Sequence, residues 1–245
     1  MDSRIVKQRL RRTLARAAVG TATAVAVMMT ASDASAQAYP VKPVRLIIPF
    51  PPGGATDAVG RTFAAKFAEA WGQQVVVDNR PGANTIVAAE VTARSAPDGY
   101  TLFLTTAATH VNNVLLYRKL PYDARKSFQL ISMATVLPYS FAAHPSLPPN
   151  TIRELVAFAK ARPGQLSYGS SGTGSSGHLA GVLFDTMTGT KMVHVPYKGA
   201  AEGLNDLVGG RLQLSFDNIP PAIPHRQPPS RMARITASGE SCRLL

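Results

Sequence analysis

Hydrophobic and polar positions in the first half of the chain repeat with two periods, one typical of strands and one typical of helices. Residues 44–48 are aliphatic apart from one arginine, and Pro49 ends the run. Apolar side chains then recur every three or four positions between residues 59 and 70, which indicates a helix that ends at Gly72. Continued to residue 105, the pattern predicts strands at 44–48, 75–77 and 100–105 and helices at 59–70 and 84–95.

A second unit with the same order of elements follows an extended run at residues 129–142, which Pro138 interrupts. Thr151 is followed three residues later by Glu154, the spacing of a capping box at the start of a helix. The pattern predicts helices at 151–161, 178–188 and 201–208 and strands at 166–168, 192–195 and 212–216.

Strands that alternate with helices predict an α/β fold with parallel sheets and right-handed crossovers. The break between the two units divides this fold into two lobes. We predict lobe 1 over residues 39–135 and lobe 2 over residues 136–220. The segment 221–245 shows no helical or strand period, and we expect it to stand outside both lobes.

The first 38 residues have the composition of a secretory signal peptide. Six arginine and lysine residues precede an uncharged apolar stretch at 17–30. Two overlapping small-x-small triplets follow at 34–36 and 36–38. The apolar stretch is shorter than the ~20 residues of a membrane span, which disfavours the alternative of an uncleaved anchor. We therefore predict export and cleavage after Ala36 or Ala38. The general secretory and twin-arginine routes both stay open.

The formal net charge of +12 first suggests a nucleic-acid partner. Ten of the 26 basic residues, however, lie before Tyr39 or after Ile219, and the others are scattered without interleaved aromatic residues. We therefore expect no nucleic-acid partner. The one cysteine, Cys242, leaves the body of the chain without a disulfide, a cysteine-based metal site or a thiol nucleophile. The histidines show no metal-ligand spacing, so we expect no metal and no cofactor.

Three loops rich in Gly, Ser and Thr follow predicted strands. They lie at residues 53–56, 105–106 and 170–177. Open α/β sheets bind ligands at the carboxyl ends of their strands, and the N–H groups at the start of a helix attract anions. Each loop alone could be no more than a tight start of a helix. Three of them at equivalent places favour a shared anion-binding cleft.

Enzyme motifs give a weaker interpretation of the same loops. Residues 172–177 match the dinucleotide fingerprint GxGxxG, but no acidic residue stands at the end of the next strand, where the ribose would need it. G-x-S-x-G, H-E-x-x-H and P-loop motifs are absent from the sequence. His178, two residues after Ser176, could act as a base, although a role in the helix start or in the cleft is favoured.

Two acids follow or end predicted strands. We interpret Asp57 as a residue of a first helical turn and Asp217 as a strand-end residue, rather than as a catalytic pair. No catalytic residue is therefore predicted. An exported α/β enzyme stays open as the alternative to a binding protein.

A series of segments, taken together and in this order, carries a family resemblance. The segments are residues 39–57, DNRPGA at 78–83, PDGYTL at 97–102, YRKLPYD at 117–123, YGSSG at 168–172, SGHLAG at 176–181, VHVPYKG at 193–199 and FDN at 216–218. They resemble the mature substrate-binding receptors of tripartite tricarboxylate transporters, the Bug type of periplasmic binding protein. The resemblance covers Tyr39 to about His225.

The resemblance implies a two-lobed clamshell of the type II, Venus-flytrap kind. It implies a non-enzymatic, monomeric receptor in the periplasm. Such a receptor captures a small carboxylate, which could be a tricarboxylate, a dicarboxylate, an acidic amino acid or an aromatic acid. Its partners are the membrane subunits of the transporter. Carried over by position, the ligand-binding residues are Gly53, Gly54, Thr56, Thr105, Thr106, Ser170, Ser171, Thr173, Ser176, His178 and Asn218.

The chain departs from the family pattern near its end. Family members continue past Asn218 with a strand that returns to the first lobe, whereas residues 226–229 no longer fit. We therefore expect a receptor whose C-terminal part is missing. A non-functional fragment is the alternative that this departure leaves open.

Overall fold

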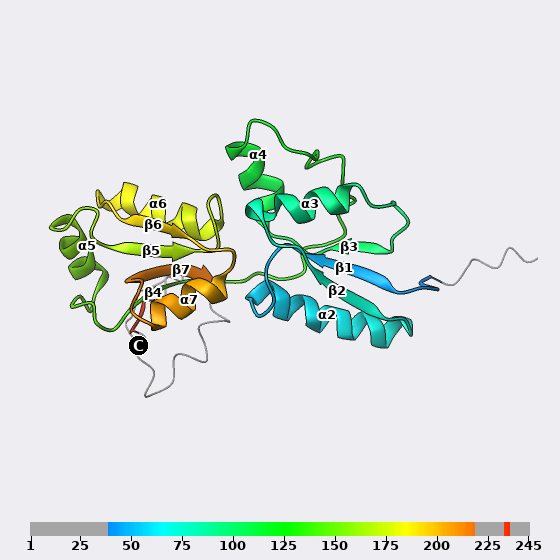
Figure 1. Cartoon of the computed structure of the whole chain (residues 1–245), viewed down its shortest axis with the longest axis horizontal. Coiled ribbons are helices and arrows are strands. Elements are labelled where there is room, and N and C mark those ends of the chain that lie inside the picture. The colour runs from blue at the N-terminus through cyan, green and yellow to red at the C-terminus, as the bar shows by residue number, and fades with distance from the viewer. Residues whose placement is uncertain (1–38, 219–232, 236–245) are drawn as a thin grey trace, which may run out of the picture. The chain divides into compact units, whose positions relative to one another are not determined.

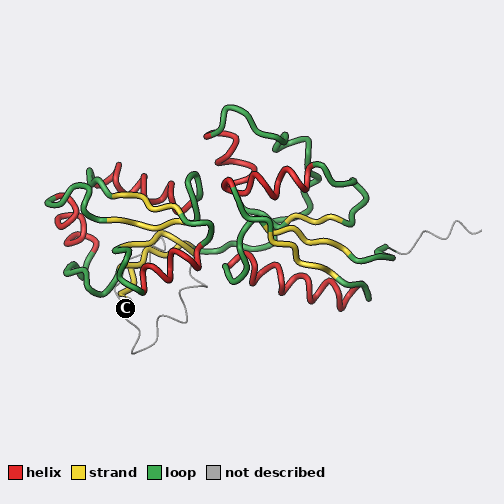
Figure 2. Tube along the Cα trace, viewed as in Figure 1, coloured by secondary structure: helices red, strands yellow, loops and turns green. Residues whose placement is uncertain are grey.

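The computed structural model describes residues 39–218 and 233–235, with helices and strands alternating along the chain (Figures 1 and 2). The described residues from Lys42 onward belong to one compact unit. The predicted signal peptide at 1–38 and most of the segment at 221–245 lie outside the described residues. Within the described part, no helix combines the length and apolar character needed to cross a membrane.

The first sheet is parallel throughout, as the sequence predicts. It consists of β1 (Val44–Ile48), β2 (Val75–Asn79) and β3 (Thr101–Phe103) in the order β2-β1-β3. Helix α2 (Ala55–Trp71) lies on one face, and α3 (Ile86–Ala93), preceded by a 3-10 turn η1 (Ala83–Thr85), lies on the other (Figure 1). Because both faces are covered, four of the five residues of β1 are buried.

The second sheet is mixed, which corrects the prediction of parallel sheets. It contains β4 (Tyr139–Ala143), β5 (Ser167–Ser170), β6 (Val193–Pro196), β7 (Leu214–Asn218) and β8 (Ala233–Ile235), in the order β6-β5-β7-β4-β8. Strands β5, β6 and β7 run parallel, whereas β4 is antiparallel to both of its neighbours. A non-helical segment, rather than a crossover helix, leads into β4, so nothing forces it to run parallel.

Helices α5 (Ile152–Lys160), α6 (Ser176–Thr188) and α7 (Ala200–Val208) accompany this sheet. Half of the capping box predicted at the start of α5 is present, because the Glu154 N–H donates to Thr151 Oγ1 at 3.1 Å. The Glu154 carboxylate accepts the N–H of Asn150, at 2.8 Å, in place of the N–H of Thr151. Residues such as Phe141, Tyr168 and Phe216 form the core between the sheet and its helices.

Two segments differ from their predictions. After the loop predicted at 105–106 the sequence predicts no helix, but a π-helical turn, η2 (Ala108–Asn112), continues there into α4 (Asn113–Leu116). Of the extended run at 129–142, only the part within β4 pairs in a sheet.

Strand β8 lies in the segment for which the sequence predicts no strand. It pairs antiparallel with β4, with Ala142 opposite Arg234. Three residues are too few to show the alternation by which a strand is recognised, and the open edge of β4 supplies the pairing partner.

Candidate ligand-binding site

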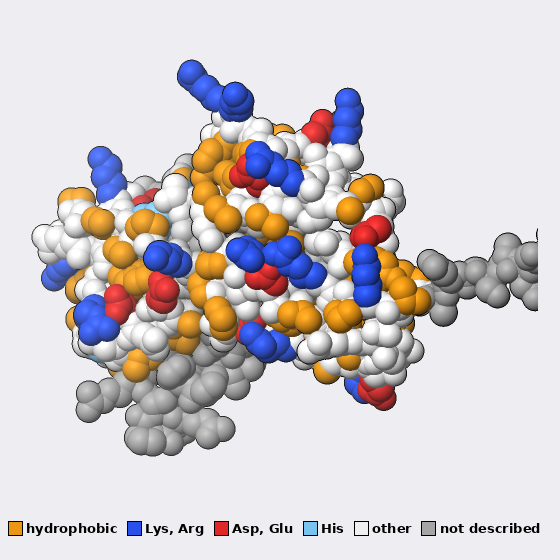
Figure 3. Space-filling model, turned by 45° about the vertical axis from the view of Figure 1, so that its right-hand side comes forward, with side chains coloured by type: hydrophobic (Ala, Val, Ile, Leu, Met, Phe, Trp, Pro, Cys, Tyr) orange, Lys and Arg blue, Asp and Glu red, His pale blue; other side chains and the backbone are white. Residues whose placement is uncertain are grey.

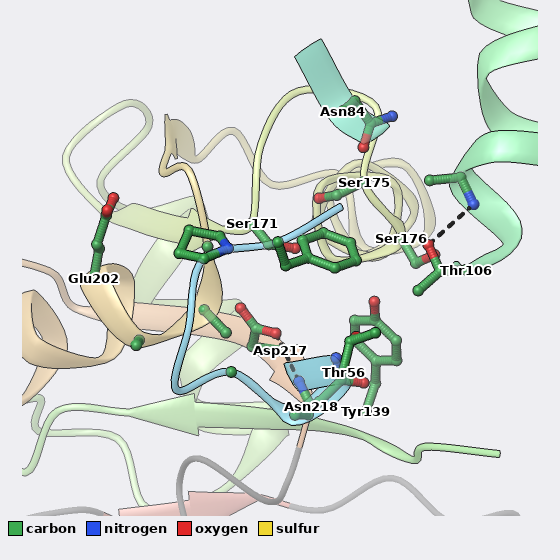
Figure 4. A pocket seen from close by; sticks show the side chains of 18 of the residues that line it. Thr56, Asn84, Thr106, Tyr139, Ser171, Ser175, Ser176, Glu202, Asp217 and Asn218 are labelled. Atoms are coloured by element: carbon green, nitrogen blue, oxygen red, sulfur yellow. Dashed lines mark hydrogen bonds between the residues drawn. The ribbon is translucent and has the colours of Figure 1, made fainter. Parts of the chain in front are cut away.

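A cavity of about 140 Å³ lies at the carboxyl ends of β1, β5 and β7, within the unit that begins at Lys42 (Figure 4). Both sheets and the loops that follow their strands contribute to it. Its lining residues are Phe50, Pro51, Pro52, Gly54, Ala55, Thr56, Asn84, Thr106, Ala108, Tyr139, Ser171, Ser175, Ser176, Gly199, Ala200, Ala201, Glu202, Asp217 and Asn218. None of these is Lys, Arg or His, so a bound anion would have to rely on dipoles and neutral donors.

Three helices begin at this cavity. The N-cap residues of α2, α6 and α7 are Gly54, Ser175 and Gly199, and all three line it. The first N–H groups of a helix have no partner within the helix and carry a positive partial charge. Three helix starts around one cavity therefore favour a negatively charged group inside it.

The β1–α2 loop is stabilised by the buried carboxylate of Asp57. This carboxylate accepts hydrogen bonds from Gly53 N–H, Arg61 Nε and Asn79 Nδ2, each at 2.9 Å. Burial acts to raise the pKa of Asp57, but the bonds from Arg61, Gly53 and Asn79 outweigh it and hold the pKa below its ordinary value. Gly53 adopts φ +86°, a conformation that favours glycine. Asp57 is thus a first-turn acid, as the sequence indicates.

The β5–α6 loop is stabilised by hydroxyls and imidazoles instead. Ser170 Oγ and His194 Nε2 are hydrogen-bonded at 2.7 Å, and Ser175 Oγ caps α6 by accepting the His178 N–H at 3.2 Å. His178 Nδ1 accepts the Gly174 N–H at 3.2 Å, so His178 acts in the helix start. Burial lowers the pKa of His178, and burial together with the charge of His178 lowers the pKa of His194 to about 4. Both rings are therefore neutral at pH 7.

The third predicted loop begins a chain of hydrogen-bonded hydroxyls. Thr105 Oγ1 lies 2.6 Å from Thr109 Oγ1, which lies 2.7 Å from Thr85 Oγ1. Asn113 Nδ2 donates to Thr85 Oγ1 at 3.3 Å. These bonds attach the segment after β3 to the turn before α3, and they leave Thr106 at the cavity wall.

Asn84 presents an unusual acceptor at the cavity. Its Nδ2 donates to Asn113 Oδ1 at 2.8 Å, while its buried Oδ1 has no hydrogen-bond partner. The backbone around it is strained, since Ala83, Asn84 and Thr85 all have positive φ. Such a group suits a hydroxyl, ammonium or water donor.

The predicted site residues divide into three groups. Gly54, Thr56, Thr106, Ser171, Ser176 and Asn218 line the cavity. Gly53, Thr105, Ser170 and His178 instead support the loops through the bonds above, and Thr173 is exposed. Contact of any of the eleven with a ligand stays a prediction.

Sequence reasoning missed other lining residues, chiefly Asn84, Tyr139 and the start of α7. The start of α7 could have been found. It follows a predicted strand and precedes a predicted helix, and its N-cap is Gly199, as the N-cap of α2 is Gly54. Asn84 and Tyr139 carried no such signal.

Within the described residues, no group of three or more His, Cys, Asp or Glu side chains could hold a metal ion. The basic side chains lie scattered among acidic ones on the face shown in Figure 3.

Comparison with known proteins identifies the family. The sequence model described as tripartite tricarboxylate transporter family receptor matches residues 59–232. This chain belongs to that family. The match continues past residues 226–229, which corrects the expectation that the resemblance ends near His225.

Individual relatives agree with this assignment. Protein BugT of Bordetella pertussis is 35% identical over 202 residues, which cover 82% of this chain and 62% of BugT. The solved structure of R. palustris Rpa4515 with adipate has a TM-score of 0.69 and 39% identity, and covers 76% of this chain and 62% of that one. MatC (Rpa3494) from Rhodopseudomonas palustris with bound malate has a TM-score of 0.76 and 30% identity, with coverage of 82% and 69%.

These comparisons establish the fold as the two-lobed α/β fold of periplasmic binding proteins. The family is one of transporter receptors, and the two structural neighbours were solved with adipate and malate bound. The chain spans about three fifths of the length of the curated relatives it matches.

Proposed function

We propose that this chain is the solute-binding receptor, or a part of one, that captures a small carboxylate for a tripartite tricarboxylate-type transporter. The observation that carries the proposal is the convergence of three helix starts on a cavity that no Lys, Arg or His lines. Its partners are the membrane subunits of the transporter. Its place is the periplasm, reached through a cleavable signal peptide, and it acts as a monomer without catalysis.

The cavity suits a carboxylate better than a sugar or a cation. Helix starts supply backbone N–H donors, and Ser171, Ser176 and Thr106 add hydroxyls to the same wall. A cation would face the positive ends of three helix dipoles. The two structural neighbours described above hold adipate and malate, both dicarboxylates, which supports the same class of ligand.

One contact favours a second candidate, a hydrolase. Ser170 Oγ and His194 Nε2 lie 2.7 Å apart, the separation of a nucleophile and its base. Ser170 is only 2% exposed, however, and neither residue lines the cavity. The Ser170 hydroxyl also donates to the carbonyl oxygen of Gly172 at 3.1 Å and accepts from the N–H of Gly172 at 3.3 Å. The pair therefore serves the loop, and binding without turnover is favoured.

Calorimetry of the 245-residue chain against malate, adipate, citrate, glutamate and nicotinate tests the proposal. Saturable binding of at least one, with the ligand recovered unchanged after incubation, is the expected result. Binding confined to sugars or cations would contradict the carboxylate assignment. Loss of the ligand on incubation would favour the hydrolase, and a Ser170→Ala variant that stops the loss would establish it.

A further inference from the structure

We propose that the chain binds a carboxylate ligand together with one proton, which Asp217 takes up from the solvent. The inference rests on the proposed function, because it concerns the charge state of the same cavity when a carboxylate enters it.

Asp217 is an acid in the wall of a cavity that otherwise favours anions. It belongs to β7, and its side chain lies beside Asn218 in the cavity wall (Figure 4). Its Oδ1 accepts the N–H of Asn218 at 2.8 Å. Among the ion pairs of residues 39–218, none includes Asp217. The carboxyl group therefore lacks a cation to hold it in the ionised form.

The groups around Asp217 do not supply that cation. Strand β4 contributes Tyr139 to the cavity, and α7 contributes Glu202. Burial raises the pKa of Tyr139, and the charge of Asp217 raises it further. Helix α6 and the residue after β5 contribute only serines, and the lining residues of the first lobe do not titrate.

A comparison with Asp57 shows which stabilising groups Asp217 lacks. The Asp57 carboxylate is buried, but it has Arg61 beside it and two further donors. Burial instead raises the pKa of Asp217 to about 7, against the smaller opposing effect of the Asn218 N–H. Near neutral pH the free cavity therefore holds Asp217 in both protonation states.

A bound carboxylate shifts this balance further. Two like charges in one small cavity repel each other, so the ligand raises the proton affinity of Asp217. One proton then passes from the solvent to a carboxylate oxygen of Asp217. The protonated acid can donate its O–H to the ligand, so a group that opposes binding becomes one that supports it.

Calorimetry with malate and adipate between pH 6 and pH 9 tests the inference on the 245-residue chain. Each pH is repeated in buffers of different ionisation enthalpy, which gives the number of protons taken up. At pH 8 we expect an uptake close to one proton per ligand. Above pH 7 we expect Kd to rise about tenfold per pH unit.

The variant Asp217→Asn fixes the neutral form of this side chain. We expect its Kd for malate to stay constant between pH 6 and pH 9, without proton uptake. At pH 8 it should therefore bind malate about tenfold more tightly than the unmodified chain. The matched control Asp98→Asn, at an exposed turn outside the cavity, should keep the pH dependence of the unmodified chain. Thermal melting verifies that each variant is folded.

Several results would overturn the inference. A Kd that is independent of pH in the unmodified chain would do so, as would an unchanged pH dependence in Asp217→Asn. Release of a proton on binding L-aspartate, without uptake on binding malate, would mean that ionised Asp217 pairs with an ammonium group instead. If no carboxylate binds at any pH, the proposed function fails and this inference with it. Carboxylate binding without proton uptake would refute this inference and leave the proposed function intact.

Discussion

The β1–α2 and β5–α6 loops both carry the start of a helix to the cavity, but different chemistry stabilises them. In the first, one carboxylate, Asp57, accepts three hydrogen bonds, one of them from Arg61. In the second, Ser170, Ser175 and two neutral histidines form a network without any charge. Both loops therefore bring backbone amides to the cavity, whereas the groups that stabilise each loop differ.

The largest expected effect comes from Gly177, in the first turn of α6. A Cβ added there would lie 2.3 Å from the carbonyl oxygen of Phe216, a backbone atom that cannot move aside. We expect Gly177→Ala to lower the free energy of unfolding by about 3 kcal/mol, as overpacking does, and to abolish carboxylate binding. Thermal melting measures the loss.

Gly54→Ala is the matched control in the other loop. A Cβ at Gly54 would meet only the carbonyl oxygen of Pro51, at 3.9 Å. Its melting temperature should stay near that of the unmodified chain. Equal melting temperatures for the two variants would show that the β5–α6 loop is not tightly packed against β7.

A bulkier side chain at Gly54 should weaken ligand binding without preventing folding. Gly54 lines the cavity and has room for a side chain, so Gly54→Val should fold yet obstruct the amides at the start of α2. Loss of one helix start is expected to weaken malate binding about tenfold, measured by calorimetry. The comparison variant Lys198→Ala should change Kd by less than about twofold, since Lys198 does not line the cavity. A larger loss in a lysine or arginine variant would point to a side-chain cation as the main anion ligand.

The last expected effect is a difference in acid sensitivity between the loops. His194 has a pKa of about 4 in the folded chain, below its ordinary value of 6.5. Between those two pH values the unfolded chain binds a proton at His194 that the folded chain does not, so the contribution of His194 to the free energy of unfolding falls as pH falls. Asp217, whose pKa is raised to about 7 in the folded chain, contributes in the opposite direction over the same range. Asp57, whose pKa lies below 3.8 in the folded chain, loses its contribution only at lower pH. Acidification should therefore weaken the β5–α6 loop first.

Urea unfolding at pH 7, 5.5 and 4.5 measures this difference in chains that carry Asp217→Asn, which removes the opposing contribution of Asp217. In this background, the decrease across the range should be smaller with His194→Gln than without it. Asp57→Asn is the control, because it should keep the full decrease. An identical decrease in all three proteins would show that other groups govern the acid response.

Sequence reasoning located most elements because their buried faces are apolar. Strand β1 has the predicted limits, and α6 begins two residues before its predicted start. The helical segment formed by η2 and α4 was not predicted, because it buries polar side chains and exposes apolar ones. It buries Thr109, Asn112 and Asn113 through hydrogen bonds and exposes Leu115. A method that follows apolar periodicity cannot find a helix that buries its polar face.

The site residues also differ in whether a local sequence pattern predicts them. The two helix-start loops were predictable, because glycine and hydroxyl residues after a strand have a local signature. The approach of Tyr139 to Asn218 depends on the antiparallel register of β4 and β7, which are distant in the sequence. Local pattern does not encode that register, so Tyr139 could not be assigned to the cavity in advance.

The hydroxyl row behind Thr106 links the turn before α3 to the segment after β3. Thr85 Oγ1 accepts from Asn113 Nδ2 and is bonded to Thr109 Oγ1, which is bonded in turn to Thr105 Oγ1. Each hydroxyl has one hydrogen and two lone pairs, so either oxygen of each Thr–Thr pair can be the donor. The hydrogens of the row can therefore turn over together without any movement of a heavy atom, and the strand end beside the cavity can offer either a hydrogen or a lone pair.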